Sequence, residues 1–286
     1  MHAGTITTER EMKMIRKLKT GIVNLADRLG YEIRQKPSAL SVREMTHFES
    51  CLHLLTNMRQ TINIVQVGAN DGITNDPLYD FISKHPSYTR LILCEPQTFL
   101  IPELEKNYGF HGAKYIYNGA IGPETSLKLY RIKRECWAEC SVPYAKGWPE
   151  YRAPTGVTSS SYEHVSAWVS KYYKGNLQHP DVIEEVSVDC VNVRELLKRA
   201  DLFDAIDVLQ VDAEGFDDQV IYASNIEEFL PLVVNFEYGN LPKQRAQELR
   251  EYLTQKGYVF SQHGIDGLAI RAPGQMQKSP NRKHES

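Results

Sequence analysis

Most of the chain alternates between two hydrophobic patterns. Short apolar runs typical of buried strands occur at residues 62–67, 90–94, 114–120, 126–132, 185–190, 208–211, 232–237 and 267–271. Between them, at residues 76–84, 99–108, 193–199, 217–223 and 245–256, the pattern is that of amphipathic helices. Alternating strands and helices predict an α/β fold with a mainly parallel central sheet flanked by helices. Ligands are then expected at the carboxyl ends of the strands.

Residues 1–60 carry a different pattern and are expected to form an N-terminal helical extension. Between Thr7 and Gly30 the apolar residues form one stripe, and the opposite face is rich in lysine and arginine. A second helix is expected at residues 42–59. A basic amphipathic helix suits a membrane surface, a coiled coil or packing against protein. We favour packing on the domain or on a second copy of the chain, which would make a homodimer.

Two further segments depart from the alternation. Residues 136–180 are dense in tryptophan, tyrosine, proline, glycine and serine. We expect them to form a lid or substrate wall, with a short helix at residues 162–171. The tail at residues 272–286 is polar and lacks an apolar pattern, so it is expected to be disordered. The remaining residues, 61–271, are expected to form one domain.

The bulk composition narrows the class of protein. The chain has 286 residues, of which 42% are hydrophobic and 24% charged, and a formal net charge of -3. This mild acidity argues against nucleic-acid binding, which usually requires a basic surface. No apolar run approaches the roughly 20 residues that cross a bilayer, and the N-terminus lacks an apolar signal core. A cytoplasmic protein without a transmembrane segment is therefore expected.

The five cysteines have no paired C-x-x-C spacing, so neither a disulfide framework nor a zinc site is indicated. Cys94 and Cys190 lie in apolar, strand-like runs and are interpreted as small core residues. Cys136 and Cys140, four positions apart, are a weaker candidate for a metal or redox pair.

A glycine-bearing loop, Val67-Gly68-Ala69-Asn70-Asp71-Gly72, follows the first expected strand directly. Glycines let the backbone turn sharply and approach a ligand closely, and asparagine tolerates left-handed conformations. The next strand ends in Glu95, about 20 residues beyond the loop, where a carboxylate can bind the two hydroxyls of a ribose. Loop and acid together predict a nucleoside cofactor; the alternative is a surface role for Glu95.

Two kinds of cofactor fit such a loop, a dinucleotide and S-adenosylmethionine. A dinucleotide needs a helix N-terminus that is open to its pyrophosphate. Here Asp71 and Asp76 follow the loop, and their negative charge suits a diphosphate poorly. The positive sulfonium and amino groups of S-adenosylmethionine suit these acids better, so methyl transfer is favoured.

Carboxylates also end two later strands. Asp212 and Glu214 follow the run at 208–211, and Glu237 ends the run at 232–237. In a parallel sheet these strand ends meet in the same crevice as the cofactor. The three acids could hold a substrate hydroxyl, act as a general base or bind Mg²⁺ through oxygen ligands. Alternatively, Asp212 and Glu214 only cap and orient the next helix.

The segments V-G-A-N-D-G, C-E-P, L-Q-V-D-A-E-G-F-D and N-F-E-Y together resemble the FkbM family of S-adenosylmethionine-dependent methyltransferases over residues 62–271. The resemblance implies a Rossmann-like class I methyltransferase fold that methylates hydroxyl oxygens, often on sugars or natural products. By position, Gly68, Asn70 and Gly72 would cradle the methionine part and Glu95 would bind the ribose. Asp212 and Glu214 would lie beside the methyl group. The implied cofactor set is completed by Val67, Ala69, Pro96, Asn118 near the adenine, Ala120 and Asp212.

Two further positions bear on this resemblance. Gln66 stands where the family often has an acid, which weakens any role for this residue in cofactor binding. The stretch from Thr158 to Val165 resembles a serine-containing segment with a following Glu-His pair in part of the family. His164 is therefore the preferred catalytic base, because its ordinary pKa lies near neutrality. An ordinary surface histidine is the alternative.

The leading hypothesis is an O-methyltransferase that uses S-adenosylmethionine, with Mg²⁺ as an optional second cofactor, on a small-molecule or glycan acceptor. Asp212 and His164 would share the base role, and Glu214 and Glu237 would orient the acceptor or the Mg²⁺ ion. The aromatic residues of the lid would shape the acceptor pocket. An NAD-dependent oxidoreductase or epimerase, and a non-catalytic assembly subunit that binds cofactor, are the alternatives.

Overall fold

The computed structural model describes residues 45–272. The expectations for residues 7–30, for a homodimer through that segment and for the tail from residue 273 concern parts of the chain outside this range. The compact unit described below begins at Thr46. Its first helix is α2 (His47–Met58), where the Thr46 hydroxyl caps the helix by accepting a hydrogen bond from the Glu49 N–H.

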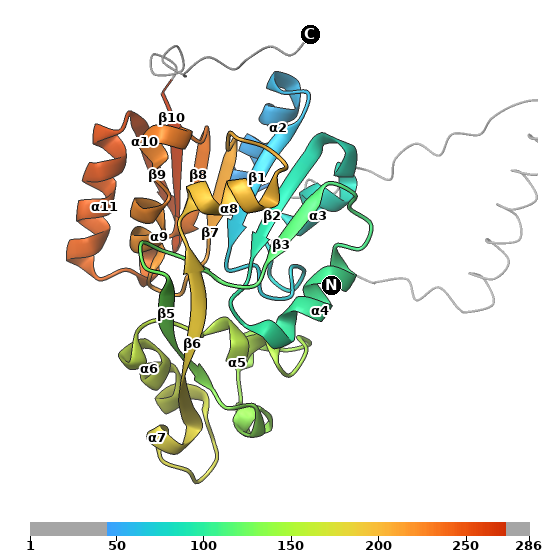
Figure 1. Ribbon diagram of the computed structural model, residues 1–286. Coiled ribbons are helices and arrows are strands. Elements are labelled where there is room, and N and C mark those ends of the chain that lie inside the picture. The colour runs from blue at the N-terminus through green and yellow to red at the C-terminus, as the bar shows by residue number, and fades with distance from the viewer. Residues whose placement is uncertain (1–44, 273–286) are drawn as a thin grey trace, which may run out of the picture. The chain divides into compact units, whose positions relative to one another are not determined.

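Seven strands form the main sheet, which Figure 1 shows between two layers of helices. Five strands run parallel, whereas the strand next to the last edge is antiparallel to both of its neighbours. The expectation of a mainly parallel central sheet is confirmed. In spatial order the strands are β3 (Lys114–Tyr117), β2 (Thr89–Cys94), β1 (Ile62–Val67), β7 (Val208–Val211), β8 (Val233–Glu237), β10 (Asp266–Arg271) and β9 (Tyr258–His263).

Helices cover both faces of this sheet because its central strands bury side chains on both sides. In β1, Val65 and Val67 belong to one apolar cluster, and Ile62 and Ile64 belong to the other. Strands buried in this way have continuous apolar runs, which is why the sequence pattern located them. The first face packs against α8 (Val193–Ala200), α9 (Asp217–Ala223), α10 (Ile226–Phe229) and α11 (Lys243–Gln255), and the second against α2, α3 (Tyr79–Lys84) and α4 (Ile101–Asn107).

Two expected strands lie outside the main sheet. They are β5 (Ser126–Ile132) and β6 (Ile183–Val191), which pair antiparallel and extend away from the main sheet in Figure 1. A short strand, β4 (Ala120–Ile121), pairs with β6 and completes a second sheet of three strands. The expected strand at 114–120 is therefore two strands, because the chain leaves the main sheet after β3 and joins β6 through β4. Side chains of β5 and β6 alternate between more and less exposed, unlike those of the central strands.

Sequence analysis missed the edge strand β9. Most of its side chains are at least partly exposed, including Val259 and Gln262, so it lacks the apolar run of a buried strand. It pairs with β10 across a tight turn in which Gly264 has φ +63. A polar edge strand of this kind is recognised by its partner and its turn rather than by hydrophobicity.

The segment between β5 and β6 has its own small apolar core, in which Trp137, Val165 and Val169 are buried. The short helix expected at 162–171 is present as α6 (Tyr162–Tyr172), capped by Ser161. Two more helices, α5 (Arg152–Gly156) and α7 (His179–Val182), were not expected. Short 3-10 turns lie at Pro86–Tyr88, Thr98–Leu100, Arg134–Glu139, Pro143–Ala145 and Tyr238–Asn240.

All five cysteines are free thiols, and Cys94 and Cys190 are buried as expected. Burial raises the pKa of Cys136 and raises that of Cys140 to about 11, which disfavours the thiolates that metal binding and redox exchange require. Within residues 45–272, the structure has no helix long and apolar enough to span a bilayer.

Candidate active site

The glycine-bearing loop turns sharply where β1 ends. Gly68 has φ +81, and a side chain there would place its Cβ 1.8 Å from the Asp212 carbonyl oxygen, so the loop lies directly against the end of β7. The N–H groups of Gly68 and Ala69 both donate to the Cys94 carbonyl, which ties the loop to the end of β2. Asn70 adopts φ 48. The loop therefore joins the carboxyl ends of three neighbouring strands.

Glu95 is held by this loop and is 2% exposed. One carboxylate oxygen accepts the Asn70 N–H at 2.7 Å, and the other accepts the Gln97 N–H at 2.8 Å. A carboxylate oxygen has further lone pairs, so both can still accept hydrogen bonds from two ligand hydroxyls. Burial raises the pKa of Glu95 to about 7, and the two backbone N–H groups oppose this rise.

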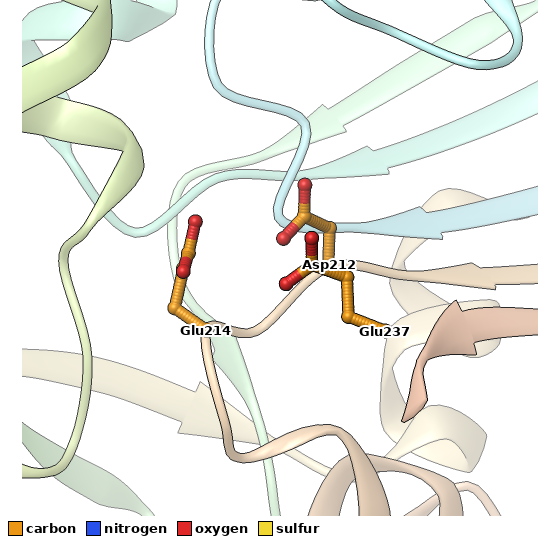
Figure 2. A group of neighbouring side chains, drawn as sticks. All are labelled: Asp212, Glu214 and Glu237. Carbon is orange, nitrogen blue, oxygen red and sulfur yellow. The ribbon is translucent and has the colours of Figure 1, made fainter. Parts of the chain in front are cut away.

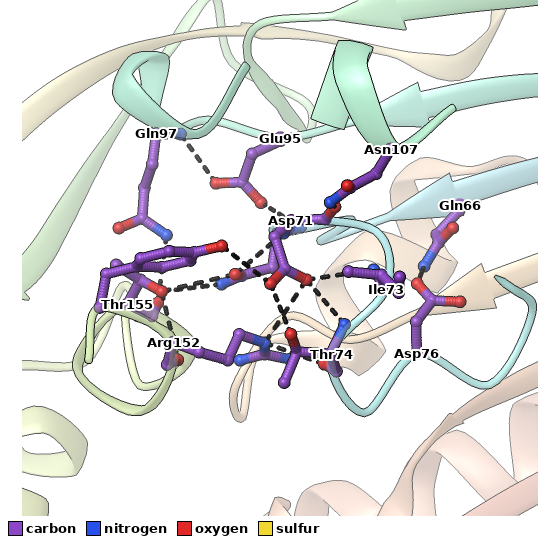
Figure 3. Close-up of polar contacts among 12 residues, drawn as sticks. Gln66, Asp71, Ile73, Thr74, Asp76, Glu95, Gln97, Asn107, Arg152 and Thr155 are labelled. Atoms are coloured by element: carbon purple, nitrogen blue, oxygen red, sulfur yellow. Dashed lines mark hydrogen bonds and ion pairs between the residues drawn. The ribbon is translucent and has the colours of Figure 1, made fainter. Parts of the chain in front are cut away.

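Asp71 and Asp76 serve the loop itself, as Figure 3 shows. Asp71 accepts the N–H groups of Ile73 and Thr74 at 3.1 and 2.9 Å. Asp76 accepts the N–H groups at the start of α3, and Gln66 donates its side-chain amide to it at 2.6 Å. Sequence analysis used the charges of these two acids to choose the cofactor, whereas in the structure their hydrogen bonds shape the backbone of the loop.

A cavity that opens to solvent, with about 670 Å³ of empty space including its mouth, lies above the strand ends. Seven residues of the expected cofactor set line it: Val67, Gly68, Asn70, Glu95, Pro96, Ala120 and Asp212. The remaining three lie outside its wall and support it. Ala69 packs in the core, and the missing side chain of Gly72 leaves room for Leu104 and Tyr108. Asn118 donates to the Glu95 carbonyl at 2.9 Å.

The acids Asp212, Glu214 and Glu237 come together as expected, with an oxygen of each within 4.8 Å of the others. Figure 2 shows them converging from the turn after β7 and from the end of β8. Their backbone is fixed by Asp217, a fully buried residue that accepts the N–H groups of Glu237 at 3.0 Å and Ala213 at 3.3 Å. This acid at the start of α9 thus joins two strand ends, a role that sequence analysis missed.

Burial and mutual repulsion shift the acids towards their protonated forms. Burial raises the pKa of Asp212 to about 6, and burial with the charges of Asp212 and Glu214 raises that of Glu237 to about 8. The pKa of Glu214 is also raised well above its ordinary value, mainly by burial. One oxygen of Asp212 is buried without a hydrogen-bond partner among the described residues. Asp212 is therefore more ionised than Glu237 at neutral pH.

His164 also joins this cluster. Its Nε2 lies 3.3 Å from a carboxylate oxygen of Glu214. Burial lowers the pKa of His164 and raises that of Glu214, so each shift favours the uncharged form, and His164 is uncharged near neutral pH. An uncharged imidazole can accept a proton, which is the state that a general base requires.

The turn that carries Glu214 is held in an uncommon backbone conformation. Glu214 has φ 47, in the left-handed region that side-chain-bearing residues rarely adopt. The Ser159 hydroxyl donates to the Glu214 carbonyl oxygen at 2.7 Å. Ser159 is 1% exposed, and its backbone pairs with Tyr130 of β5. The segment between β5 and β6 therefore positions both the backbone and, through His164, the side chain of Glu214.

A second hollow, with about 1450 Å³ of empty space including the part open to solvent, adjoins the first. Asp212 and Glu214 line both spaces, together with Arg152 and Gly156, whereas Glu237 and His164 line only the second. Four aromatic side chains form part of the wall of the second hollow: Tyr144, Trp148, Trp168 and Tyr172. The acids thus lie where two spaces meet, an arrangement suited to transferring a group from a molecule in one to a molecule in the other.

Several wall residues of the first cavity had no clear sequence signal. The Thr155 hydroxyl accepts a hydrogen bond from the side-chain amide of Asn70 at 3.2 Å. The Thr155 backbone carbonyl accepts another from the side-chain amide of Gln97 at 3.1 Å. The Thr158 hydroxyl donates to the side-chain carbonyl oxygen of Gln97. Thr155 lies 85 residues from Asn70, and Thr158 lies 61 residues from Gln97. Thr155 was marked only by its location in the aromatic-rich segment, whereas Thr158 begins the stretch that resembles part of the family.

A family model described as the methyltransferase FkbM domain matches residues 66–260. Among solved structures, a methyltransferase from Geobacter sulfurreducens is similar at 12% identity and a TM-score of 0.38, covering 93% of this chain and 98% of its own. A precorrin-6y C5,15-methyltransferase from Geobacter metallireducens has 7% identity and a TM-score of 0.36, covering 83% and 96%. No protein with a curated description matches the sequence.

Proposed function

We propose that this chain, which belongs to the FkbM family of S-adenosylmethionine-dependent methyltransferases, methylates a hydroxyl oxygen of a sugar, a glycan or another natural product. Family membership decides against the NAD-dependent alternative and agrees with the Rossmann-like class I methyltransferase fold. The observation that carries the hydroxyl acceptor is the placing of Asp212, Glu214 and Glu237 between two adjoining spaces. A cytoplasmic location and a homodimer stay predictions.

The first cavity fits S-adenosylmethionine. Glu95 has lone pairs free for the two ribose hydroxyls, and Gly68 and Asn70 leave the loop open beside Asp212 for the methionine part. Pro96 and Ala120 line the side near Ile121 and Leu129, where an apolar wall suits an adenine. When bound, the cofactor supplies an electrophilic methyl group on a sulfonium. The chain supplies alignment and a base.

Asp212 and His164 share the base role in this proposal. The buried oxygen of Asp212 has no hydrogen-bond partner within residues 45–272, so a lone pair is available for the acceptor's hydroxyl proton. His164 is uncharged near neutral pH and contacts Glu214, through which a proton can pass on towards the second hollow. Glu214 and Glu237 orient the acceptor by hydrogen bonds to its neighbouring hydroxyls. Deprotonation matters because a neutral alcohol is a weak nucleophile.

The wall of the second hollow supports a sugar-like or polyketide-like acceptor. Trp148, Trp168 and Tyr172 offer apolar ring faces, and the acids below them offer hydrogen-bond acceptors. A pocket that combines apolar walls with a few convergent polar groups is typical of small-molecule sites. In this proposal the segment 136–180 serves as the substrate wall or lid.

The test is methyl transfer from labelled S-adenosylmethionine to a panel of glycosides and to an extract of host metabolites. We expect Asp212→Asn to lower turnover about 10²- to 10⁴-fold, the usual contribution of a general base, with nearly unchanged affinity for S-adenosylhomocysteine. Asp181→Asn removes an exposed acid of α7, away from Asp212 in the sequence, and serves as the control. Full turnover in Asp212→Asn would remove this residue from the mechanism. A labelled methylamine product would refute O-methylation, and a labelled methyl ester would refute the hydroxyl acceptor, because its methyl group is carried by a carboxylate oxygen.

The same three carboxylates satisfy the preference of Mg²⁺ for oxygen ligands, so the assay is repeated after treatment with EDTA. Turnover that survives EDTA assigns the acids to acceptor binding and proton transfer. Turnover that is lost, and restored by MgCl₂ only when Glu237 is intact, assigns them to a bound cation. Cofactor binding without any transfer would leave the non-catalytic assembly subunit as the function.

A further inference from the structure

Arg152 is the one cationic side chain in the wall of the first cavity, as far as the described residues show. It belongs to α5, between β5 and β6, and is only 8% exposed. Burying an arginine is costly unless its charge is compensated. The acids Glu95, Asp212 and Glu214 line the same cavity, and the charge of Arg152 opposes the rise that burial causes in the pKa of each.

The guanidinium group is fixed in place by contacts that use only part of its donor capacity. Its Nε donates to the Thr74 carbonyl at 3.0 Å and lies 4.0 Å from Asp71, while the group packs over the Trp148 ring at 5.6 Å. Figure 3 shows it reaching from the α5 segment towards the loop. A guanidinium has five N–H donors, and among residues 45–272 no hydrogen bond is made by the two Nη atoms, so their donors remain for another partner.

The absence of a side chain at Gly156 leaves space for the guanidinium group of Arg152. A Cβ on Gly156 would lie 2.4 Å from the first Nη of Arg152, so a side chain at this position would displace the guanidinium. Gly156 lines both spaces, as Arg152 does. The buried cation therefore lines the same ligand space as Asn70, Thr155 and Asp212.

We propose that Arg152 binds the α-carboxylate of the methionine part of S-adenosylmethionine. This inference rests on the proposed function, because it takes S-adenosylmethionine as the molecule in the first cavity. That end of the cofactor has one carboxylate beside a positive amino group and a positive sulfonium. The acidic wall of this cavity as a whole suits the positive groups, and Arg152 is the one cationic side chain among the described lining residues that suits the carboxylate. Planar guanidinium and carboxylate groups form paired, charge-assisted hydrogen bonds.

The experiment is isothermal titration of the full chain with three ligands that differ in this part of the molecule. S-adenosylhomocysteine has both carboxylate and amine, its decarboxylated analogue keeps the amine, and methylthioadenosine has neither. We expect Arg152→Met to weaken the binding of S-adenosylhomocysteine about 10- to 100-fold, the range for the loss of a hydrogen bond to a charged group. Binding of the decarboxylated analogue and of methylthioadenosine should change less than about threefold. Arg152→Lys should be intermediate, because it keeps the charge and loses the paired geometry.

Lys171→Met is the matched control, since Lys171 lines the second hollow and not the first. It should leave all three affinities unchanged, which would separate a specific contact from a general effect of positive charge. Equal weakening of all three ligands in Arg152→Met would assign Arg152 to the structure of the wall and overturn the proposal. Unchanged binding of S-adenosylhomocysteine would also overturn it and would direct Arg152 to an anionic group of the acceptor. Failure of the unmodified protein to bind S-adenosylhomocysteine would instead refute the proposed function.

Discussion

At the scale of single residues, the acids of the site are individually costly for the folded protein. Asp212, Glu214 and Glu237 lie within 4.8 Å of one another and each has a raised pKa. Groups selected for stability alone would not be gathered in this way, because like charges repel and burial removes their hydration. Strongly perturbed acids in a cleft are the mark of a functional site rather than of a structural ion-pair network.

This cost predicts a pH dependence of stability. Glu237 has an ordinary pKa of 4.5 and a folded-state pKa of about 8, so between these values the folded protein holds a proton that the unfolded chain releases. The contribution of this group to the unfolding free energy is therefore fully present below about pH 4.5 and is lost as the pH rises to about 8. We expect the unfolding free energy of the ligand-free protein to fall by up to about 1 kcal/mol per pH unit over the upper part of this range.

Glu237→Gln should flatten that slope, because the amide stays neutral at every pH and can still accept the hydrogen bond from Asn240. Urea unfolding at pH values from 6 to about 8.5 measures the effect. Glu105→Gln, which alters an exposed acid on α4, is the comparison and should keep the original slope. A slope that is the same in Glu237→Gln and the unmodified protein would show that this proton is not taken up on folding.

At the scale of elements, the buried strands were predicted correctly from the sequence and the exposed strand was not. β1 and β7 were located within a residue because both of their faces are covered, which leaves continuous apolar runs. The exposed edge strand β9 was missed, and β5 and β6 were located without any sign that they belong to a second sheet. Strand partners depend on contacts across long stretches of chain, which a local pattern does not encode.

The site shows the same division. Asp212 and Glu237 were found because each ends an apolar run, and parallel strands bring such ends together. Arg152 and Thr155 were missed, and Ser159 was named only as part of a family-like stretch, because all three lie in short helices and turns of the segment between β5 and β6. Their contacts with Thr74, Asn70 and Glu214 span 78, 85 and 55 residues. The local sequence around these residues does not indicate which distant residues they contact.

One of these long contacts carries a prediction. Ser159→Ala removes the hydroxyl that holds the Glu214 carbonyl, at a turn where Glu214 has φ 47. We expect stability to fall by about 1 kcal/mol, the usual value of one hydrogen bond, and turnover to fall about 10- to 100-fold as Glu214 moves. Affinity for S-adenosylhomocysteine should stay within about twofold. Chemical unfolding, single-turnover kinetics and calorimetry measure the three quantities.

Ser170→Ala provides the comparison for that variant, because Ser170 is an exposed serine of the neighbouring helix α6. Its stability and turnover should match those of the unmodified protein. If Ser159→Ala lost stability while keeping full turnover, the contact between the two segments would be structural only.

At the scale of the whole described unit, the two ligand spaces share a wall. Arg152 and Gly156 of α5 line both, while the strand ends supply the floor. The segment between β5 and β6 therefore takes part in binding in both spaces, although its small core is separate from the two clusters of the main sheet. An element with few core contacts of its own opens locally at lower cost than the central sheet does.

Because the two spaces share this wall, we expect cofactor binding to order the part of the wall that also lines the acceptor pocket. Binding of S-adenosylhomocysteine should slow amide hydrogen exchange in residues 152–158, since Arg152, Thr155 and Thr158 all line the first cavity. Exchange in α11, which contributes nothing to either wall, should slow only as far as global stability rises, by about 2.7 kcal/mol at a ligand concentration 100-fold above Kd. Exchange measured by mass spectrometry, with and without ligand, resolves both segments. Equal protection in the two would mean that the cofactor stabilises the unit as a whole and does not order the α5 wall, so the acceptor would then bind in either order.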